Sequence, residues 1–215
     1  MTDTPRIALI TGGNRGLGRS AALELARDGV DVLITHRTNA AQAKALVAEL
    51  TVLGRTARAL QLDTSAVASF AAFAERLCEV LAETGRERLD LLVNNAGTGL
   101  HAAFADTTEQ QFDEMIDVHL KGVFFLTQRL LPLLADGASI VNVSSGLARF
   151  SHPGSAAYAI AKGGVEVLTR YLAVELADRG ITVNTLAPGA IAGLFASRSR
   201  WITGQRIEAS GGMRL

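Results

Sequence analysis

Three residues in the C-terminal half of the chain could carry out acid–base chemistry: Ser145, Tyr158 and Lys162. Tyr158 and Lys162 stand four residues apart in Tyr-Ala-Ile-Ala-Lys, so a helix there would place the phenol and the ammonium on one face. Because a neighbouring cation favours the phenolate, we expect a lowered pKa for Tyr158. Such a tyrosine could transfer a proton near neutral pH, although two residues at this spacing also occur on ordinary helix edges.

Ser145 ends an apolar run, residues 139–145, that predicts a buried strand whose tip could aim the hydroxyl at the same place. Short apolar runs and longer helical patterns alternate along the whole chain, with glycines just past several helices. The predicted strands are residues 6–10, 30–35, 56–62, 89–93, 138–143, 181–186 and 205–209, and the predicted helices are residues 17–28, 40–53, 65–84, 108–134 and 156–179. We expect Thr64 or Ser65 to cap the third helix, and Thr107 or Thr108 to cap the fourth.

The predicted strands are near-continuous apolar runs, as a parallel sheet covered on both faces requires. Strictly alternating strands and helices leave few topologies, because crossover connections are right-handed. The sequence therefore predicts a single α/β domain with a doubly wound parallel sheet of about seven strands and helices on both faces.

A glycine-rich segment, Thr11-Gly-Gly-Asn-Arg-Gly-Leu-Gly18, lies directly between the first predicted strand and helix. Glycines allow backbone amides to approach a pyrophosphate, and the helix that follows favours negative charge at its N-terminus. A tight glycine turn without a ligand is the alternative, but the position after the first strand favours a dinucleotide site. The candidate cofactor-binding residues in this segment are Thr11, Gly12, Asn14, Arg15, Gly16, Leu17 and Gly18.

The end of the second predicted strand indicates which dinucleotide binds. An NAD site usually has an acidic residue there for the ribose 2′-hydroxyl, but residues 35–38 read Thr-His-Arg-Thr. Arg37 and Arg15 would instead suit a 2′-phosphate, unless both are merely solvated surface charges. We therefore expect NADP(H) to be preferred, with NAD(H) still possible.

These motifs together resemble those of the short-chain dehydrogenase/reductase family, and are most similar to its 3-oxoacyl-acyl-carrier-protein reductase-like members. The resemblance rests on the glycine segment, on Asp63, on Asn94-Asn-Ala-Gly97, on Ser145 with Tyr158 and Lys162, and on Pro188-Gly189, which occur in the family's order over nearly the whole chain. It implies a Rossmann-like fold and an NADP-dependent oxidoreductase that reduces a ketone or oxidises a secondary alcohol.

The resemblance also implies roles for individual residues. Tyr158 would be the general acid, Ser145 would hydrogen-bond the substrate oxygen, and Lys162 would hold the nicotinamide ribose and lower the pKa of Tyr158. The remaining cofactor contacts would come from Asp63 and Thr64 beside the adenine, from Asn95, Ala96 and Gly97 along the cofactor, and from Pro188, Gly189 and Ile191 near the carboxamide.

The sequence departs from the family pattern at His119. The family usually has an asparagine at this point of its fourth helix, where it holds a water molecule for proton relay. Histidine can both donate and accept, so His119 is a candidate catalytic residue in that relay. The alternative is a structural histidine whose hydrogen bonds are satisfied within the helix.

A second departure follows residue 192. The family's mobile lid over the substrate, and most of the helix after it, have no counterpart before residues 201–205, which resemble the segment preceding the last strand. Either the protein is naturally shortened here, or a disordered loop is missing from the sequence. Because a lid excludes water and completes the substrate pocket, an alternative function is an NADP(H)-binding sensor or scaffold with little catalysis. The residues that would select a substrate are mostly absent, so the sequence does not identify it.

Composition excludes several other classes of protein. The 215 residues have a formal net charge of zero, which argues against nucleic-acid binding, and no apolar stretch approaches the length of a membrane span. Cys78 is the only cysteine and no histidine pair has metal-ligand spacing, so we expect no disulfide and no catalytic metal. The N-terminus lacks a signal-peptide pattern, and a cytoplasmic protein is expected.

The expected partners are a small carbonyl or alcohol substrate and a second copy of the chain. Helices 108–134 and 156–179 would form the surface of a homodimer or homotetramer, although one face of each must pack on the sheet. Three histidines keep open roles: His36 near the adenosine ribose or simply exposed, and His101 and His152 at the pocket edge or on the surface.

Overall fold

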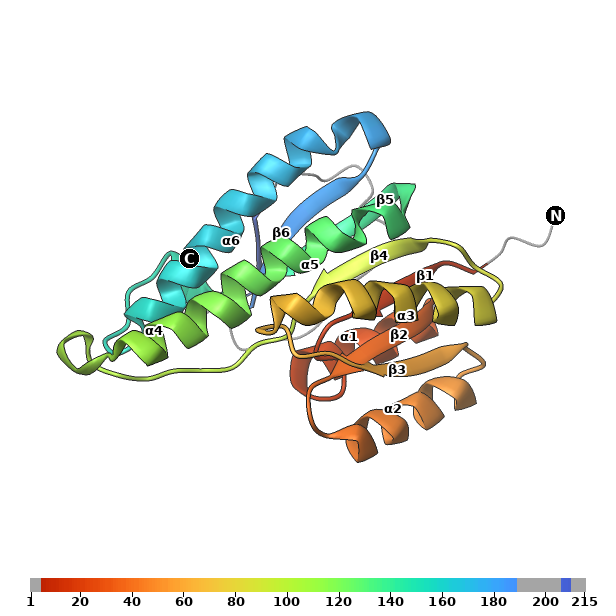
Figure 1. Ribbon diagram of the computed structural model, residues 1–215, viewed down its shortest axis with the longest axis horizontal. Coiled ribbons are helices and arrows are strands. Elements are labelled where there is room, and N and C mark those ends of the chain that lie inside the picture. Colours follow the sequence, from red (N-terminus) through yellow and green to blue (C-terminus); the bar gives the residue numbers. More distant parts are fainter. Residues whose placement is uncertain (1–4, 189–205, 210–215) are drawn as a thin grey trace.

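The computed structural model describes residues 5–188 and the backbone of residues 206–209 (Figure 1). Its centre is a parallel sheet of seven strands in the order β3-β2-β1-β4-β5-β6-β7. The strands are β1 (Ile7–Ile10), β2 (Asp31–His36), β3 (Ala57–Gln61), β4 (Leu89–Asn94), β5 (Leu134–Val143), β6 (Thr182–Pro188) and β7 (Arg206–Ala209). The predicted doubly wound parallel sheet is confirmed.

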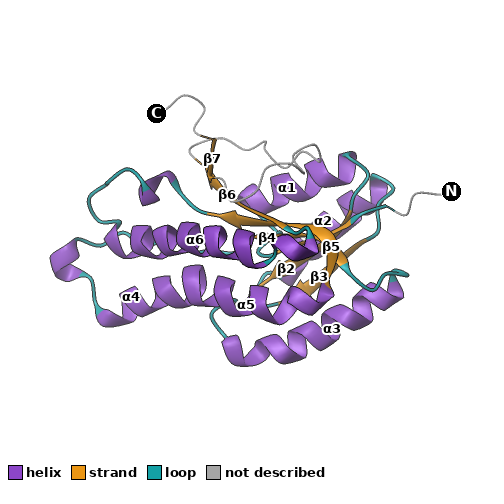
Figure 2. Ribbon diagram, turned by 90° about the horizontal axis from the view of Figure 1, so that it is seen from above, coloured by secondary structure: helices purple, strands orange, loops and turns teal. Residues whose placement is uncertain are grey.

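Helices cover both faces of this sheet, as Figure 2 shows. Helices α1 (Gly16–Arg27) and α2 (Ala40–Val52) lie on one face, and α3 (Phe70–Glu83), α4 (Glu109–Ile116), α5 (Gly122–Leu130) and α6 (Ala156–Glu175) lie on the other. The strand order reverses between β1 and β4. In open α/β sheets, ligands bind in the crevice beyond the carboxyl ends of the strands at such a reversal.

The β1 strand shows why the buried strands are continuous apolar runs. Ile7 and Leu9 pack into the core beneath α3 and α5, whereas Ala8 and Ile10 pack into the core beneath α1 and α2. Successive side chains of a strand point to opposite faces, so a strand covered on both faces must be apolar at every position. All four residues are fully buried.

The single helix predicted over residues 108–134 is divided into segments with different hydrogen-bonding patterns. Thr108 caps α4 by accepting from the Gln111 backbone N–H, and Gln111 reciprocates, which confirms the expected cap. A π-helical turn, Asp117–Lys121, then separates α4 from α5, and a 3₁₀ turn at Leu131–Leu133 leads into β5. Strand β5 thereby begins at Leu134 rather than at residue 138, because Leu134 already pairs with Leu89.

The expected caps of the third helix are wrong. Asp63 accepts hydrogen bonds from both the backbone N–H and the hydroxyl of Ser65, which turns the chain before any helix begins. A 3₁₀ turn at Val67–Ser69 follows, and α3 begins only at Phe70. Asp63 and Thr64 are thus held at the carboxyl end of β3 instead of entering a helix.

Three of the expectations concern residues near the end of the chain. The missing lid after residue 192, Gly189 and Ile191 all fall outside the described residues. Within the part that is described, no helix has the length and apolar character needed to cross a bilayer.

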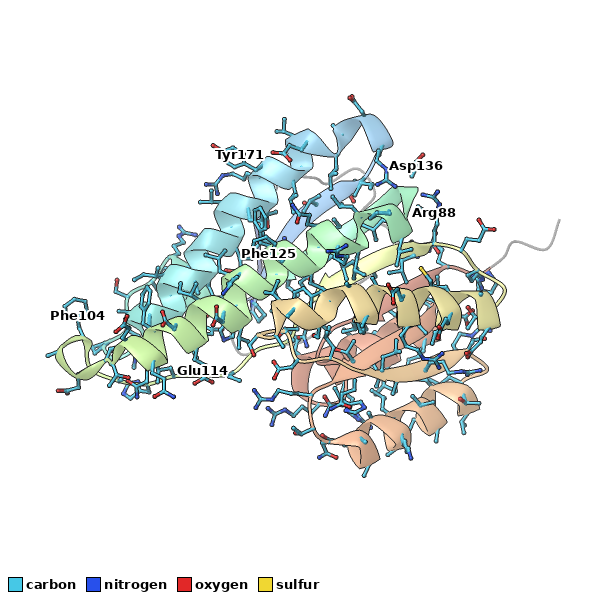
Figure 3. All side chains as sticks on the ribbon, in the orientation of Figure 1. Arg88, Phe104, Glu114, Phe125, Asp136 and Tyr171 are labelled. Carbon is cyan, nitrogen blue, oxygen red and sulfur yellow. The ribbon has the colours of Figure 1, made fainter. Side chains whose placement is uncertain are left out.

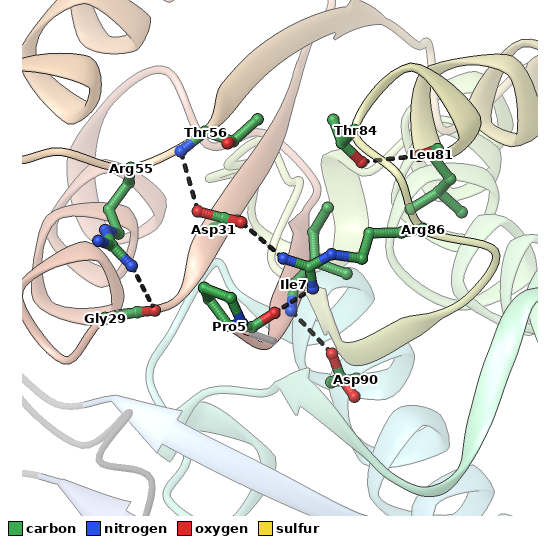
Figure 4. A network of polar contacts seen from close by, with 10 residues as sticks. All are labelled: Pro5, Ile7, Gly29, Asp31, Arg55, Thr56, Leu81, Thr84, Arg86 and Asp90. Atoms are coloured by element: carbon green, nitrogen blue, oxygen red, sulfur yellow. Dashed lines mark hydrogen bonds and ion pairs between the residues drawn. The ribbon is translucent and has the colours of Figure 1, made fainter. Parts of the chain in front are cut away.

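A polar network closes the end of the sheet opposite the candidate site (Figure 4). Arg86 forms an ion pair with Asp31 at 2.9 Å, with only 13% and 7% of the two side chains exposed, and also donates to the Pro5 carbonyl oxygen. The other Asp31 oxygen accepts from the Thr56 N–H at 2.9 Å. This network joins the starts of β1 and β2 to the segments that precede β3 and β4.

We expect Arg86→Met to lower the free energy of unfolding by about 3 kcal/mol, because the substitution leaves the buried Asp31 carboxylate without its cation. Urea unfolding of the purified protein measures the change. Arg76→Met is the matched control, since Arg76 pairs with Glu79 and Glu83 at exposed positions and its loss should matter much less. Equal destabilisation by the two substitutions would contradict this account of the network.

Candidate active site

The candidate site is organised by a junction between the ends of β1 and β4. The Thr11 hydroxyl accepts hydrogen bonds from the backbone N–H groups of Asn95 and Ala96, both at 2.9 Å. The Asn95 side-chain amide donates in return to the carbonyl oxygens of Thr11 and Gly12, at 2.9 and 3.2 Å. These four bonds hold the glycine segment against the turn formed by residues 94–97.

Glycine is required at two points of this junction. Gly12 has a φ of 61°, a conformation that side chains other than glycine rarely adopt. A Cβ atom on Gly18 would lie 2.5 Å from the Asn95 side-chain nitrogen, so any larger residue would displace Asn95. The glycine spacing therefore allows the strand-to-helix turn and the residue 94–97 turn to approach each other closely.

A cavity of about 560 Å³ extends from this junction over the carboxyl ends of β1, β2, β3 and β4. Most of the predicted cofactor-binding residues line it: Gly12, Asn14, Arg15, Gly16, Leu17, Arg37, Asp63, Thr64, Asn95, Ala96 and Gly97. Thr11 and Gly18 are buried in the junction. Pro188 ends β6, and neither it nor the catalytic candidates belong to this cavity wall.

The sequence interpretation missed six further residues of the cavity wall, namely Thr38, Asn39, Gln42, Leu62, Thr98 and Val118. One of them carried a recognisable signal. Asn39 precedes the apolar pattern of α2 and caps that helix by accepting from the Gln42 N–H. The side chain of Gln42 in turn accepts from the Asn14 side-chain amide at 2.9 Å, which links α2 to the glycine segment.

The residues present fit a phosphorylated dinucleotide. The first turn of α1 has no side-chain cap, so its backbone N–H groups remain free to bind a phosphate next to Gly16. The exposed guanidinium groups of Arg15 and Arg37 both line the cavity. Partial burial raises the pKa of Asp63, but hydrogen bonds from Ser65 and the nearby charge of Arg37 outweigh this effect and lower the pKa overall.

The predicted catalytic trio is brought together beside this cavity. Ser145 lies close enough to the Tyr158 hydroxyl to lower its pKa, and the Ser145 hydroxyl accepts from the Leu147 N–H at 3.2 Å. The Lys162 ammonium lies 5.7 Å from the centroid of the Tyr158 ring and donates to the Val143 carbonyl oxygen at 2.6 Å. Helix α6 thus presents Tyr158 and Lys162 on one face, as their spacing predicted.

The expected lowering of the Tyr158 pKa is wrong for this structure. Burial raises the pKa of Tyr158, and the hydrogen bond from Ser145 offsets this only in part. Burial also lowers the pKa of Lys162 to about 8, because its side chain is almost wholly enclosed. The four-residue spacing predicted the proximity of the two groups correctly, but desolvation rather than their mutual attraction dominates the pKa of the phenol.

His119 lies in the π-helical turn, fully buried, with its ring edge-on to Tyr158 at a centroid distance of 5.0 Å. Its Nε2 accepts from the Thr98 backbone N–H at 3.3 Å, so the neutral ring carries its proton on Nδ1. Nδ1 has no hydrogen-bond partner among the described residues. A Cβ atom on Gly97 would lie 2.6 Å from this ring, which explains the glycine that ends the Asn-Asn-Ala-Gly motif.

Asn94, the first residue of that motif, faces the core rather than the cavity. It donates to the Thr127 hydroxyl and to the Asn142 side-chain oxygen at 3.0 and 2.8 Å, and Asn142 donates to the Thr169 hydroxyl at 2.9 Å. Thr185 completes this fully buried network by donating to Thr169 at 2.8 Å. The network ties the strands β4, β5 and β6 to α5 and α6, and so fixes the strand ends that carry the site.

The three remaining histidines lie outside the predicted catalytic trio and His119. His36 is at the end of β2, and its buried Nδ1 has no partner among the described residues. His101 and His152 are exposed on two separate loops, with their ring centroids 6.0 Å apart. Among the described residues, no group of three or more potential ligands is placed to hold a metal ion.

Comparison with known proteins identifies the family to which this chain is similar. A family model described as short chain dehydrogenase matches residues 6–200. The chain is 34% identical to a 3-oxoacyl-[acyl-carrier-protein] reductase of Staphylococcus epidermidis over 97% of this chain and 98% of the relative. It is 32% identical, over the same shares of the two chains, to an uncharacterized oxidoreductase of Methylorubrum extorquens.

Solved structures agree with this assignment. The landomycin C-6 ketoreductase LanV, with bound NADP and rabelomycin, has a TM-score of 0.92 and 34% identity over 97% of this chain and 96% of that chain. The reductase LugOII, which catalyses keto-reduction at C1 during lugdunomycin biosynthesis, has a TM-score of 0.88 and 37% identity over 98% of this chain and 97% of that chain.

We expect His119 to stay neutral from about pH 5 to about pH 9, with its proton on Nδ1, because burial and the charge of Lys162 lower its pKa to about 3. Nitrogen-15 NMR of the histidine rings tests this directly, with His119→Asn used to assign the signals. The Nε2 shift should be that of an unprotonated nitrogen throughout. A titration of this ring with a midpoint near 6.5, the ordinary value for histidine, would contradict the assigned tautomer and burial.

Proposed function

Because the chain belongs to the short-chain dehydrogenase/reductase family, we propose that it interconverts a ketone and a secondary alcohol with NADP(H), using Tyr158 as the general acid and base. The observation that carries the proposal is the position of Tyr158 beside the buried Lys162, whose ammonium lies 5.7 Å from the centroid of the phenol ring, with Ser145 close enough to lower the Tyr158 pKa. When bound, the nicotinamide supplies or accepts the hydride at the substrate carbon. The protein's own task is to orient the carbonyl and to exchange one proton at its oxygen.

Each of the three residues has a separate part in that task. The Tyr158 hydroxyl gives its proton to the substrate oxygen as the carbonyl becomes an alcohol, and takes it back in the reverse direction. The Ser145 hydroxyl hydrogen-bonds the same oxygen and keeps it within reach of Tyr158. Lys162 stabilises the phenolate that remains, and the N–H groups not used by the Val143 carbonyl are available to the nicotinamide ribose.

We place His119 in this site as the residue that replaces the family's asparagine. Its unpartnered Nδ1–H is a buried donor next to Tyr158 and suits a water molecule that would return a proton to the phenolate. The bond from Thr98 occupies Nε2, so His119 holds such a water in position and does not itself become charged. Retention of kcat in His119→Asn together with its loss in His119→Phe would support this role, and equal loss in both would oppose it.

Tyr158→Phe should lower kcat/KM by at least about a hundredfold and leave NADPH binding nearly unchanged, because it removes only the transferable proton. NADPH oxidation against a panel of ketones measures the activity, and fluorescence titration measures the binding. Tyr171→Phe is the matched control, since Tyr171 is the other tyrosine of the chain and lies 65% exposed on α6. Tight NADPH binding without turnover of any ketone by the wild type would favour the sensor or scaffold function instead.

The choice of NADP(H) over NAD(H) rests on the absence of an acidic residue after β2 and on the two cavity-lining arginines. Arg37→Ala should raise the Kd for NADPH about tenfold or more and change the Kd for NADH less than about twofold, because only NADPH carries the 2′-phosphate. Calorimetric titration measures both constants. Arg27→Ala, in the last turn of α1 and outside the cavity wall, should change neither.

We also propose that α5 and α6 form the contact between two copies of the chain. Phe124 and Phe125 on α5, and Val167, Tyr171 and Val174 on α6, are 39% to 77% exposed, and Figure 3 shows Phe125 and Tyr171 on these neighbouring helices. Such a density of exposed apolar side chains is typical of an interface. Tyr171→Asp with Val174→Asp should halve the mass measured by light scattering, whereas Val52→Asp, at an 87% exposed position on α2, should not.

A further inference from the structure

Two loops border the place where a substrate must reach Ser145 and Tyr158. One loop, residues 146–155, begins directly after Ser145 and ends at the helix that carries Tyr158. The other, residues 98–103, begins directly after Gly97, which lines the dinucleotide cavity. The Ala102 N–H donates to the Gly154 carbonyl oxygen at 3.0 Å, so the two loops are joined. A carbonyl bound at Ser145 and Tyr158 therefore lies next to both of them.

Four exposed side chains of these loops, Arg149, Phe150, His152 and His101, form what we call the rim. The His101 and His152 rings lie 6.0 Å apart at 52° to each other, one from each loop. The Arg149 guanidinium lies over the Phe150 ring at 5.3 Å. The rim therefore offers three aromatic rings and one planar cation. Arg149, Phe150 and His152 lie within the nine residues before Tyr158, and His101 belongs to the loop joined to them by the Ala102 bond.

The backbone fixes where the two histidines stand. Gly154 has a φ of 79°, and a Cβ atom there would lie 2.4 Å from the His101 ring, so only glycine allows this ring to lie against the loop. His152 Nδ1 lies 2.9 Å from the Pro153 carbonyl oxygen. Since a carbonyl oxygen only accepts, Nδ1 is the donor, and Nε2 of the neutral ring is left as an acceptor.

These contacts favour one chemical class of substrate. Aromatic faces and a planar cation gain most from a flat, conjugated ring system, through offset stacking and cation–π contact. A flexible aliphatic chain would gain little from such faces beyond simple burial. The free acceptor on His152 adds a preference for a hydroxyl donor on the ring system.

We propose that the rim binds a planar, fused-ring aromatic ketone that carries a phenolic hydroxyl, and so sets the substrate class of the proposed ketoreductase. The ketone oxygen lies at Ser145 and Tyr158, the rings stack against the rim, and the phenolic O–H donates to His152 Nε2. The proposal rests on the proposed function for its orientation, but the binding it describes can be measured without turnover.

The test is calorimetric binding to the enzyme saturated with NADP⁺, which cannot reduce a ketone. The probes are 5-hydroxy-1-tetralone, 1-tetralone without the hydroxyl, and the acetoacetyl thioester of N-acetylcysteamine as a flexible chain. We expect 5-hydroxy-1-tetralone to bind most tightly. The double variant His101→Ala/His152→Ala should weaken its binding about tenfold, and should change binding of the thioester less than about twofold.

A second variant separates stacking from hydrogen bonding. His101→Phe/His152→Phe keeps two aromatic rings, so 1-tetralone should bind as before while the advantage of the hydroxylated probe disappears. Thermal unfolding of both variants checks that the loops remain folded. The proposal is overturned if the alanine variant binds both tetralones as tightly as the wild type, or if the thioester is the tightest ligand of the wild type.

The two proposals fail separately. Tight binding of the tetralones without NADPH-dependent turnover of any ketone would count against the proposed function and would leave the rim as their binding site. Turnover of small ketones by an enzyme that binds neither tetralone would uphold the proposed function and overturn the assignment of the rim.

Discussion

The site depends on the junction between Thr11 and Asn95 at the point where the strand order reverses. A hydroxyl that accepts two backbone N–H groups and an amide that donates to two backbone carbonyls join the ends of β1 and β4. The glycine segment extends from one side of this junction and residues 96–98 from the other. Because Gly97 contacts the His119 ring and the Thr98 N–H binds its Nε2, the position of His119 beside Tyr158 also follows from the junction. One set of hydrogen bonds between side chains and the backbone thus aligns the proposed phosphate-binding turn with the proposed proton-transfer site.

Burial shapes the electrostatics of the proton-transfer site more than any charge pair does. It raises the pKa of Tyr158, lowers that of Lys162 to about 8 and lowers that of His119 to about 3. All three shifts have the same physical meaning, since a low-dielectric site disfavours whichever form is charged. A proton that leaves Tyr158 therefore creates a phenolate that needs the Lys162 cation close by. The Val143 carbonyl, which accepts from the Lys162 ammonium, stabilises that cation and holds it near the phenol ring.

The sequence predicted the parts of the molecule that short local patterns encode. The continuous apolar strands, the glycine turn, the Thr108 cap and the shared face of Tyr158 and Lys162 all depend on residues a few positions apart. The π-helical turn at Asp117–Lys121 could not be predicted, because an apolar pattern of helical period runs through it unchanged. The sign of the Tyr158 pKa shift was also beyond reach, since it depends on how deeply the phenol is enclosed. The place of Asn94 in a buried network depends on Thr127, Asn142 and Thr169, which come from three other elements.

The two halves of the proposed site also differ in how close together in the sequence their residues are. The proposed dinucleotide half consists largely of backbone amides, glycines and an uncapped helix start, which the eight residues from Thr11 to Gly18 supply. The proposed substrate half depends on side chains from two loops that meet through the Ala102–Gly154 bond, the packing of the His101 ring on Gly154 and the contact between His101 and His152. Substitutions of the four rim side chains would change the proposed substrate contacts without removing any hydrogen bond of the junction between Thr11 and Asn95. A scaffold built in this way can keep one reaction and vary its substrate, because the rim residues proposed to bind the ring system are separate from the residues proposed to transfer the proton.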